Sequence, residues 1–451
     1  MTRLADMPLE SLRALESSLD REYTLQRGNR LSLDLTRGKP AADQLDLSQG
    51  LETAINGNYK ASDGTDTRNY GQLRGIPEAR RLGGEILEVD PAQVICWGNS
   101  SLGLMHLCAE LALDTGLWGD DRRWGNDPAP KILTPVPGYD RHFTLSASLG
   151  LEMINVAMDE DGPDIAAVET LVKDDPSIKG IWCVPKYSNP TGCIYSDDRV
   201  AAIARLPKVA AASDFVVFWD NAYAVHDFEF PRAPLASLFD LARAAGTEDH
   251  VLLFGSTSKI TLASAGISFL AASDLVLKVI EQRLNISSVG PDKVNQLRHA
   301  RFLEGRLEKH MAEHAKLLKP KFDLVQQVLA EGLADLDIAS WTRPRGGYFV
   351  SLDTRPGLAG TIGRLASETG LSLTPAGATF PQGRDPNDNN LRIAPSFATL
   401  TDLKTALEVF VLCVKLASVR DEIHRRDEIH RRDDTGKHAH NDTKSAPGST
   451  I

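Results

Sequence analysis

The chain has 451 residues, enough to bury a large core and to divide into more than one domain. Its 50 Lys and Arg residues against 61 Asp and Glu give a net charge of −11, which argues against nucleic-acid binding. The five cysteines are scattered and lack CxxC spacing, so they favour neither disulfides nor a metal site and fit a reducing cytoplasm. No apolar run reaches ~18 residues, so we expect a cytoplasmic protein without a membrane segment.

An amphipathic helix is predicted over residues 8–27, where leucines recur at helical spacing with charges between them. After the apolar stretch 31–35 comes Thr36-Arg-Gly-Lys-Pro40, in which Gly38 stands between two cations. Such a glycine suits a backbone that approaches an anion closely, and it equally suits a plain turn.

A predicted strand over residues 93–97 leads through Gly98-Asn-Ser-Ser-Leu-Gly103 into a helix that runs to about residue 113. Small residues at a helix start expose unpaired N–H groups, and these favour an anion together with the helix dipole. The segment therefore suits either a phosphate site formed by Asn99, Ser100 and Ser101 or a simple helix N-cap.

Further apolar runs alternate with helical patterns, for example those over residues 165–173 and 199–212. This alternation predicts an α/β fold with a three-layer, doubly wound, mostly parallel sheet. A polar motif follows most of the strands, and ligands of such sheets bind beyond the carboxyl ends of the strands. The predicted strands lie within residues 131–139, 151–156, 180–184, 215–219, 251–254 and 267–271.

A lysine stands at the carboxyl end of one of these strands, in Phe254-Gly-Ser-Thr-Ser-Lys-Ile260. Burying an unpaired ammonium costs several kcal/mol, whereas a lysine with a depressed pKa offers a neutral amine that forms a Schiff base with a carbonyl. We therefore take Lys259 as the candidate residue for holding an aldehyde cofactor. A surface lysine after a strand is the alternative.

The C-terminal third has a different organisation. Charge-laced helices are predicted from about residue 282 to 329, with a break at Gly290-Pro291. Short strands at 346–350, 371–375 and 391–394, followed by a helix at 403–416, predict a smaller α/β domain with an antiparallel sheet. We expect this domain to be built from the two chain ends.

The expected organisation has four parts. Residues 1–55 form an N-terminal helix and arm of the small domain, and 56–325 form the large cofactor-binding domain. Residues 326–432 complete the small domain, and 433–451 form a disordered tail. The six residues from Asp421 to Arg426 repeat as residues 427–432, and we interpret the repeat as a frayed helical extension.

Pyridoxal phosphate is an aldehyde whose requirements these motifs can meet. Its pyridine nitrogen needs a carboxylate, and Asp220 ends an apolar strand. Its ring oxygen needs donors, which Asn189 and Tyr223 offer, and Tyr139 offers an aromatic face. Each of these residues also has a plain alternative as a turn or packing residue. The phosphate would lie on Asn99, Ser100, Ser101, Ser256 and Ser258.

Four motifs in this order resemble the fold-type I pyridoxal-phosphate aminotransferases over nearly the whole chain. Further stretches, such as residues 290–298, are similar to the bacterial aspartate aminotransferase subgroup of the MocR-like family. The four motifs are Asn189-Pro-Thr-Gly192, Asp220-x-x-Tyr223, Ser256-x-Ser-Lys259 and Leu391-Arg-Ile-Ala394.

The resemblance implies roles for individual residues. Lys259 would be the catalytic Schiff-base lysine, and Asp220 would contact the pyridine nitrogen. Asn189 and Tyr223 would contact the ring oxygen, and Tyr139 would stack on the ring.

The resemblance also implies a substrate site and a homodimer with shared active sites. Arg392 would bind the substrate α-carboxylate, helped by the backbone at Gly38, and Tyr70 would reach the phosphate of the partner subunit's cofactor. One departure concerns the phosphate, because Ile267 stands where the wider family usually has a phosphate-binding arginine.

The implied activity is transamination of L-aspartate with 2-oxoglutarate to oxaloacetate and L-glutamate, in a ping-pong mechanism through Lys259. Three alternatives stay open: an aminotransferase for kynurenine or 2-aminoadipate, a pyridoxal-phosphate lyase, and a non-enzymatic MocR-like effector-binding module. A dicarboxylic substrate needs a second cation, and the sequence does not choose among Arg37, Lys39, Lys293 and Arg298.

Overall fold

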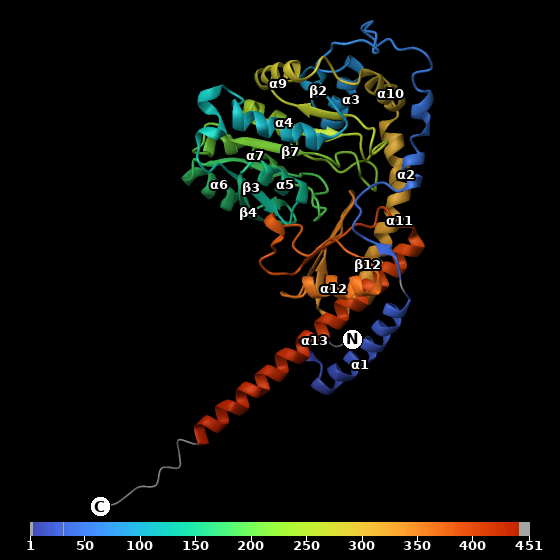
Figure 1. Ribbon diagram of the computed structural model, residues 1–451, viewed down its shortest axis with the longest axis vertical. Helices are drawn as coiled ribbons and strands as arrows, with labels where there is room; N and C mark the ends of the chain where they lie inside the picture. The colour runs from blue at the N-terminus through green and yellow to red at the C-terminus, as the bar shows by residue number, and fades with distance from the viewer. Residues whose placement is uncertain (1–2, 30, 442–451) are drawn as a thin grey trace, which may run out of the picture.

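The computed structural model describes residues 3–29 and 31–441, which form a large α/β part and a smaller α/β part (Figure 1). The large part contains an eight-stranded mixed sheet in which six strands run in one direction and β9 and β5 run in the other. The predicted α/β fold with a mostly parallel sheet is therefore confirmed. In spatial order the strands are β2 (Val94–Cys96), β9 (Ser268–Ala271), β8 (Val251–Ser256), β7 (Val216–Asp220), β6 (Ile178–Cys183), β3 (Lys131–Val136), β4 (Glu152–Asp159) and β5 (Gly162–Pro163).

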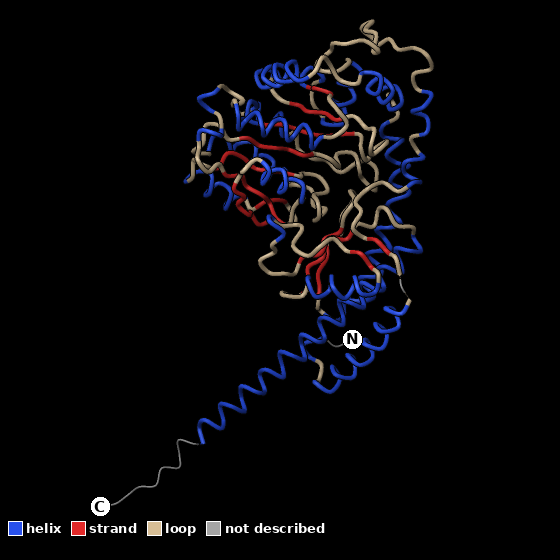
Figure 2. Tube along the Cα trace, in the orientation of Figure 1, coloured by secondary structure: helices blue, strands red, loops and turns tan. Residues whose placement is uncertain are grey.

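Helices cover both faces of this sheet and complete three layers (Figure 2). Successive residues of a strand point to opposite faces, so Leu253 of β8 packs in one core while Leu252 and Phe254 pack in the other. The first face packs against α3 (Pro77–Leu87), α6 (Ile165–Asp174), α7 (Asp197–Val209), α8 (Leu238–Ala245) and α10 (Lys293–Leu303), and the second packs against α4 (Ser101–Asp114), α5 (Asp140–Ser148) and α9 (Asp274–Ser287).

The smaller part contains an antiparallel sheet and a separate pair of short strands. The expectation that residues 371–375 join the antiparallel sheet is wrong. Its first two residues form β12, which pairs in parallel with β1, because the arm that follows the N-terminal helix runs alongside it. The antiparallel strands are β10 (Ala339–Trp341), β11 (Val350–Thr354) and β13 (Asn390–Ile393), and the parallel pair is β1 (Leu33–Asp34) and β12 (Leu371–Ser372).

One hydrophobic core joins the two chain ends in the smaller part. Leu12 and Tyr23 of the N-terminal helix are buried in it, together with Phe410 near the C-terminus. Helix α11 crosses the predicted domain boundary after residue 325, because Met311 packs in the large part and Leu329 packs in the smaller one. The exact boundaries stay a prediction. The helices outside the large sheet are α1 (Leu9–Gly28), α2 (Ala42–Asp46), α11 (Leu307–Leu333), α12 (Ala359–Thr369) and α13 (Leu400–Asn441).

Helix α13 contains both copies of the six-residue repeat and extends away from the body of the molecule (Figure 1). The expected disordered tail began at residue 433, whereas α13 continues to Asn441. Residues 442–451 lie outside the described part of the chain. Across residues 3–29 and 31–441, no helix is both long and apolar enough to cross a membrane.

Candidate active site

A cavity of about 250 Å³ lies beyond the carboxyl ends of the parallel strands, where the polar motifs converge. The loops after β2, β3, β6, β7 and β8 all contribute side chains to it. The predicted cofactor-binding residues line this cavity, with the exception of Tyr70. The lining residues are Asn99, Ser100, Ser101, Leu102, Met105, Tyr139, Val184, Asn189, Asp220, Ala222, Tyr223, Ser256, Ser258, Lys259 and Ala263.

Lys259 lies in a tight turn directly after β8, in which the Ile260 N–H donates to the carbonyl of Thr257 at 2.9 Å. Its Nζ lies 5.0 Å from the centre of the Tyr223 ring. Burial lowers the pKa of Lys259, and the charge of Asp220 opposes this effect. A lowered pKa increases the fraction of neutral amine, which is the form that attacks a carbonyl.

Asp220 ends β7 and is buried. Its Oδ2 lies 3.1 Å from Nε2 of His142, whose ring stacks on Trp182 with centroids 4.4 Å apart. Its Oδ1 is buried and has no hydrogen-bond partner among the described residues. A buried carboxylate oxygen without a donor is costly, so this atom fits a donor supplied by a bound molecule, such as a protonated pyridine nitrogen.

His142 is a residue of this site that was not predicted from the sequence. His142 follows Tyr139 by three residues at the start of α5, so one helical turn brings the two rings to 5.0 Å between centroids. The three-residue spacing from Tyr139 is the sequence signal from which His142 could have been predicted. The partner that defines the role of His142 is Asp220, which is 78 residues away along the chain.

Tyr139, Tyr223 and Asn189 form other walls of the cavity. Burial raises the pKa of both tyrosines, and the charge of Asp220 acts in the same direction. Both phenols therefore stay protonated at neutral pH and can donate hydrogen bonds. The Asn189 Oδ1 accepts a hydrogen bond from Nη1 of Arg392 at 3.2 Å, so its amide keeps two N–H donors.

Arg392 lies on β13 of the smaller part and reaches the edge of the cavity through Asn189. Its Nη1 also lies 3.1 Å from Oδ1 of Asp140, and its guanidinium carbon lies 4.8 Å from the centre of the Phe349 ring. Gly38 lies against the same ring, because a Cβ built on Gly38 would meet the Phe349 Cζ at 2.1 Å. The arm, this ring and the arginine are therefore packed together, and neither Asp140 nor Phe349 was predicted.

Small polar residues from the start of α4 and from the segment that carries Lys259 line one end of the cavity. Ser100 is the N-cap of α4 and makes no side-chain capping hydrogen bond. The Ser258 Oγ donates to the carbonyl of Asn99 at 3.0 Å, which joins the lysine turn to the start of α4. With Ser101 and Ser256, this end offers hydroxyls, amides and a helix N-terminus, which together suit a phosphate.

Ile267 is buried in the core and contributes no charge to this end. Arg298 of α10 is a cation that lines a neighbouring cavity together with Asn99. Its Nη2 donates to Oδ1 of Asn295 at 2.5 Å, and its Nε is buried with no partner among the described residues. Arg298 therefore has hydrogen-bonding capacity left beside the polar end of the cavity.

Tyr70 does not lie in the cavity of its own chain. Its side chain is 79% exposed, and Val289 beside it is 63% exposed. The Gly71 N–H donates to the carbonyl of Val289 at 2.9 Å, and Nζ of Lys293 donates to the carbonyl of Gly71 at 2.9 Å. The segment that carries Tyr70 is therefore held in place while the ring stays on the surface.

The four cations considered for a distal carboxylate have different surroundings. None of them lines the cavity that contains Lys259. Arg37 pairs with Asp34 at 2.5 Å, Lys39 lies 4.5 Å from the centre of the Phe397 ring, Lys293 is buried on the carbonyl of Gly71, and Arg298 donates to Asn295.

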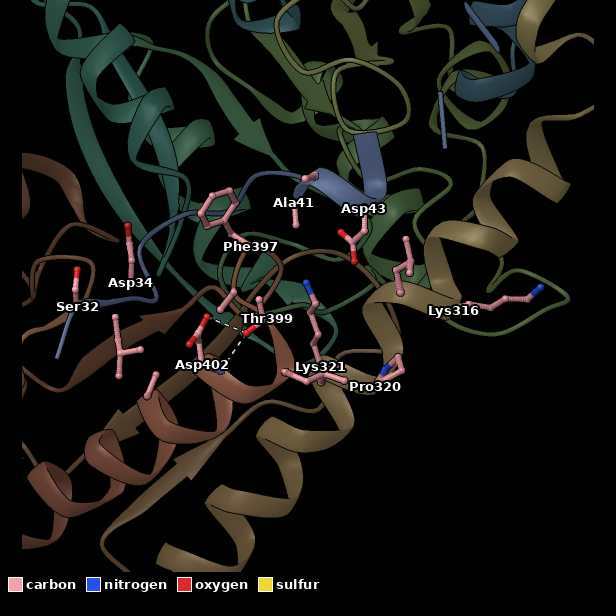
Figure 3. A pocket seen from close by; sticks show the side chains of 16 residues that line it. Ser32, Asp34, Ala41, Asp43, Lys316, Pro320, Lys321, Phe397, Thr399 and Asp402 are labelled. Atoms are coloured by element: carbon pink, nitrogen blue, oxygen red, sulfur yellow. Dashed lines mark hydrogen bonds between the residues drawn. The ribbon is translucent and has the colours of Figure 1, made fainter. Parts of the chain in front are cut away.

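A larger cavity of about 740 Å³ lies between the N-terminal arm, α11 and the start of α13 (Figure 3). Lys321 on its wall donates to the carbonyl of Ser396 at 2.8 Å, and Thr399 donates to Asp402 at 2.8 Å. None of the predicted catalytic or cofactor-binding residues lines it. Size alone therefore does not identify the reactive site in this molecule.

A lysine on a turn after a central strand, facing a buried carboxylate at the end of the neighbouring strand, defines the fold-type I aminotransferases within this α/β architecture. Residues 7–426 match the aspartate amino-transferase family, and the chain belongs to that family. Membership makes the chain an aminotransferase and implies pyridoxal phosphate as the cofactor.

Similar proteins agree with this assignment. The chain is 42% identical to the aspartate aminotransferase of Corynebacterium glutamicum over 421 residues, which cover 92% of this chain and 96% of the relative. A crystal structure of an aspartate transaminase from C. glutamicum has a TM-score of 0.90 at 41% identity, covering 93% of this chain and 99% of that one. An α-aminoadipate aminotransferase of Thermus thermophilus, complexed with N-(5'-phosphopyridoxyl)-L-leucine, has a TM-score of 0.71 at 21% identity, covering 88% and 95%, and shares the fold.

Proposed function

We propose that the protein transfers the amino group of L-aspartate to 2-oxoglutarate with pyridoxal phosphate bound at Lys259. The observation that carries the chemistry is the unpartnered Oδ1 of Asp220 in the same cavity as the lysine. The observation that carries the substrate is the 42% identity to an aspartate aminotransferase over 92% of the chain.

The cavity residues fit the cofactor at each of its functional groups. Asp220 would accept from the pyridine nitrogen, and Tyr139 would stack on the ring. Tyr223 and Asn189 would donate to the ring oxygen. The phosphate would be held by the start of α4 and by nearby hydroxyls, namely Asn99, Ser100, Ser101, Ser256 and Ser258.

Lys259 has two tasks in this proposal. Bound pyridoxal phosphate supplies an electron sink for the negative charge left when an amino acid loses its Cα proton. The Lys259 Nζ, once released by the incoming amine, would accept that proton as a neutral base. Its lowered pKa supports this role, because a neutral amine at working pH can accept a proton.

Arg392 would bind the α-carboxylate, helped by the backbone at Gly38. A guanidinium has five donors, and the Nε of Arg392 is buried without a partner among the described residues. A carboxylate approaching this side chain would accept a charge-assisted hydrogen bond and orient Cα towards Lys259. The cation for the distal carboxylate would come from Arg37, Lys39 or Arg298, or from the partner subunit.

We further propose a homodimer in which Tyr70 contacts the phosphate in the partner subunit's site. The exposed ring supports this, since it lies outside the cavity of its own chain. Co-expression of Lys259→Ala and Tyr70→Ala chains would test the arrangement. A mixed dimer would keep one intact site, so activity should return to about a quarter of wild type when the chains assort at random. No recovery would argue against shared sites.

A transamination screen tests the reaction and the substrate together. We expect L-aspartate with 2-oxoglutarate to give the highest kcat/KM, and Lys259→Ala to abolish turnover and visible cofactor absorbance. Lys131→Ala is the control, because Lys131 is paired with Asp175 outside the cavity. A preference for 2-aminoadipate or kynurenine would show that L-aspartate is not the main substrate. Release of ammonia without an oxo acid would indicate a lyase. Absence of any half-reaction would favour an effector-binding module.

A further inference from the structure

Three buried histidines contact the carbonyls of Lys259 and Ile260. Nε2 of His310 and Nε2 of His314 lie 2.7 Å and 2.9 Å from the carbonyl oxygen of Ile260. Nε2 of His226 lies 3.3 Å from the carbonyl oxygen of Lys259 itself. We call His226, His310 and His314 the histidine collar, since they contact two consecutive carbonyls of the lysine turn.

The collar histidines act as donors in these contacts. A carbonyl oxygen can only accept, so each ring must present an Nε2–H. Nδ1 of His226 and Nδ1 of His314 are buried with no partner among the described residues, which suits the neutral ring in which Nδ1 carries no proton. Burial is also the main cause that lowers the pKa of all three rings.

Metal binding does not explain the collar. His310 and His314 are four residues apart on α11, a spacing that can serve a metal, and their Nε2 atoms lie 3.3 Å apart. In the part of the chain that the structure describes, however, no group of three or more His, Cys, Asp or Glu side chains could hold a metal ion. The atom that both rings share is the carbonyl oxygen of Ile260.

The collar joins the lysine turn to two other elements. His226 follows the β7 turn that carries Asp220 and Tyr223, whereas His310 and His314 come from α11. Packing holds the rings, since His226 lies 5.6 Å from the Tyr348 ring and His310 lies 5.3 Å from the Phe302 ring. Their donor positions are therefore fixed by side chains outside the lysine turn.

We propose that His226, His310 and His314 are positioning residues that fix the lysine turn and thereby the place of Nζ relative to Asp220. The inference rests on the proposed role of Lys259 as the cofactor-binding lysine. The N–H groups of Ile260 and Thr261 are bonded to the carbonyl of Thr257, whereas the carbonyls of Lys259 and Ile260 take partners from outside the turn. Besides the histidines, the Tyr348 hydroxyl lies 3.5 Å from the carbonyl of Lys259. Losing His310 would leave the carbonyl of Ile260 with one of its two histidine contacts, that of His314, and would let the turn shift.

The test compares His310→Phe with His310→Gln. The Phe variant keeps a planar ring and removes the donor, whereas the Gln variant keeps an N–H donor on a side chain of similar reach. His250→Phe is the matched control, because the His250 ring contacts a backbone carbonyl, that of Phe215, at 2.8 Å and lies outside the lysine turn. The groups around Lys259 Nζ, namely Asp220, Tyr139 and Tyr223, stay unchanged in all three variants.

The readout is the pKa of Lys259 in the cofactor-free chain, obtained from the pH dependence of its labelling by acetic anhydride. We expect His310→Phe to raise this pKa by at least half a unit, because a shifted amine becomes more hydrated. His310→Gln should return it to within a few tenths of wild type, and His250→Phe should leave it unchanged. Binding of pyridoxal phosphate should weaken at least fivefold in His310→Phe alone.

Three results would overturn the inference. The first is a wild-type Lys259 pKa in His310→Phe, the second is an equal shift in His310→Gln, and the third is an equal shift in His250→Phe. If His310→Phe does not fold, His226→Phe against His226→Gln gives the same comparison at the carbonyl of Lys259. Borohydride trapping of the cofactor in the wild-type chain separates this inference from the proposed function, since it reports directly whether Lys259 holds pyridoxal phosphate.

Discussion

Arg392 combines one ion pair and one hydrogen bond to a neutral amide with an unused donor. Nη1 is shared between Asp140 and Asn189, while Nε is buried without a partner among the described residues. The guanidinium also lies over Phe349, so its plane is held by packing as well as by charge. A lysine could supply the charge at this position but not the planar fork of donors.

Replacing Arg392 by lysine should therefore weaken substrate binding and leave the cofactor in place. We expect kcat/KM for amino acids to fall by roughly 30-fold or more, since a charge-assisted hydrogen bond contributes about 2 kcal/mol. Steady-state kinetics with cofactor absorbance measure both parts. Arg355→Lys is the control, because Arg355 pairs with Glu422 away from the cavity. An unchanged kcat/KM would remove Arg392 from the substrate site.

His142 contacts Asp220 and does not itself line the cavity. Removing its ring nitrogen would leave both oxygens of a buried carboxylate without a partner in the described structure. We expect His142→Phe to weaken pyridoxal phosphate binding by about 10- to 100-fold, corresponding to about 1–3 kcal/mol, as measured by fluorescence titration. His142→Gln keeps a donor and should lose less. Equal losses in both variants would show that the ring, and not its N–H, is what matters.

At the scale of elements, the first and second copies of the six-residue repeat in α13 have different surroundings. Glu422 in the first copy is buried and accepts from Arg355 at 2.8 Å and from Arg426 at 2.7 Å. Arg426 in turn donates to the carbonyl of Met7 at 2.6 Å, so the first copy ties the chain start to α13. Glu428, the equivalent residue of the second copy, is exposed and pairs with the exposed His424 at 3.3 Å.

This difference predicts unequal effects from equal substitutions. Glu422→Gln should lower the free energy of unfolding by about 1–2 kcal/mol, because it weakens two charge-assisted hydrogen bonds at a buried position. Glu428→Gln should change it by less than about 0.5 kcal/mol, as expected for an exposed pair. Urea denaturation of both variants measures the two values. Similar losses would contradict the expected difference between Glu422 and Glu428.

Features that are set by residues close together in the sequence could be predicted, and features that depend on contacts between distant segments could not. The strands that end at Asp220 and before Lys259 are apolar runs closed by polar turns, and both features lie within about ten residues. The pairing of β1 with β12 joins residues 33 and 371, and neither segment encodes its partner. The same holds for His142 and Phe349, whose roles arise from contacts with distant segments. Side chains that act on another side chain are therefore the part that sequence patterns miss.

For the whole molecule, the buried histidines link stability to pH. Burial lowers the pKa of His226 to about 3, and of His299 and His314 to about 4. An unfolded histidine has a pKa of about 6.5, so below that pH the unfolded chain binds protons that the folded chain does not. The folded pKa values are the lowered ones, so stability is retained above about pH 6.5 and is lost as pH falls towards about 4.

We expect the free energy of unfolding to decrease by about 1.4 kcal/mol per pH unit for each such histidine between about pH 6 and pH 4. Urea midpoints measured across this range test the slope. His299→Gln should reduce this pH slope by the contribution of one buried histidine. His106→Gln should leave the slope unchanged, because His106 is exposed. A slope that is the same in His299→Gln as in wild type would contradict this account.

The two residues proposed to act on one substrate molecule belong to different parts of the protein. Arg392 lies on a strand of the smaller part, and Lys259 lies on the turn after a strand of the large part. Helix α11 runs through both cores, and Pro320 within it lacks the N–H that would bond one turn back, shortly after His314 contacts the lysine turn. Bending at Pro320 would therefore move the arginine while the lysine stays still. The alignment of the substrate with Lys259 therefore depends on the angle between the two parts of the protein.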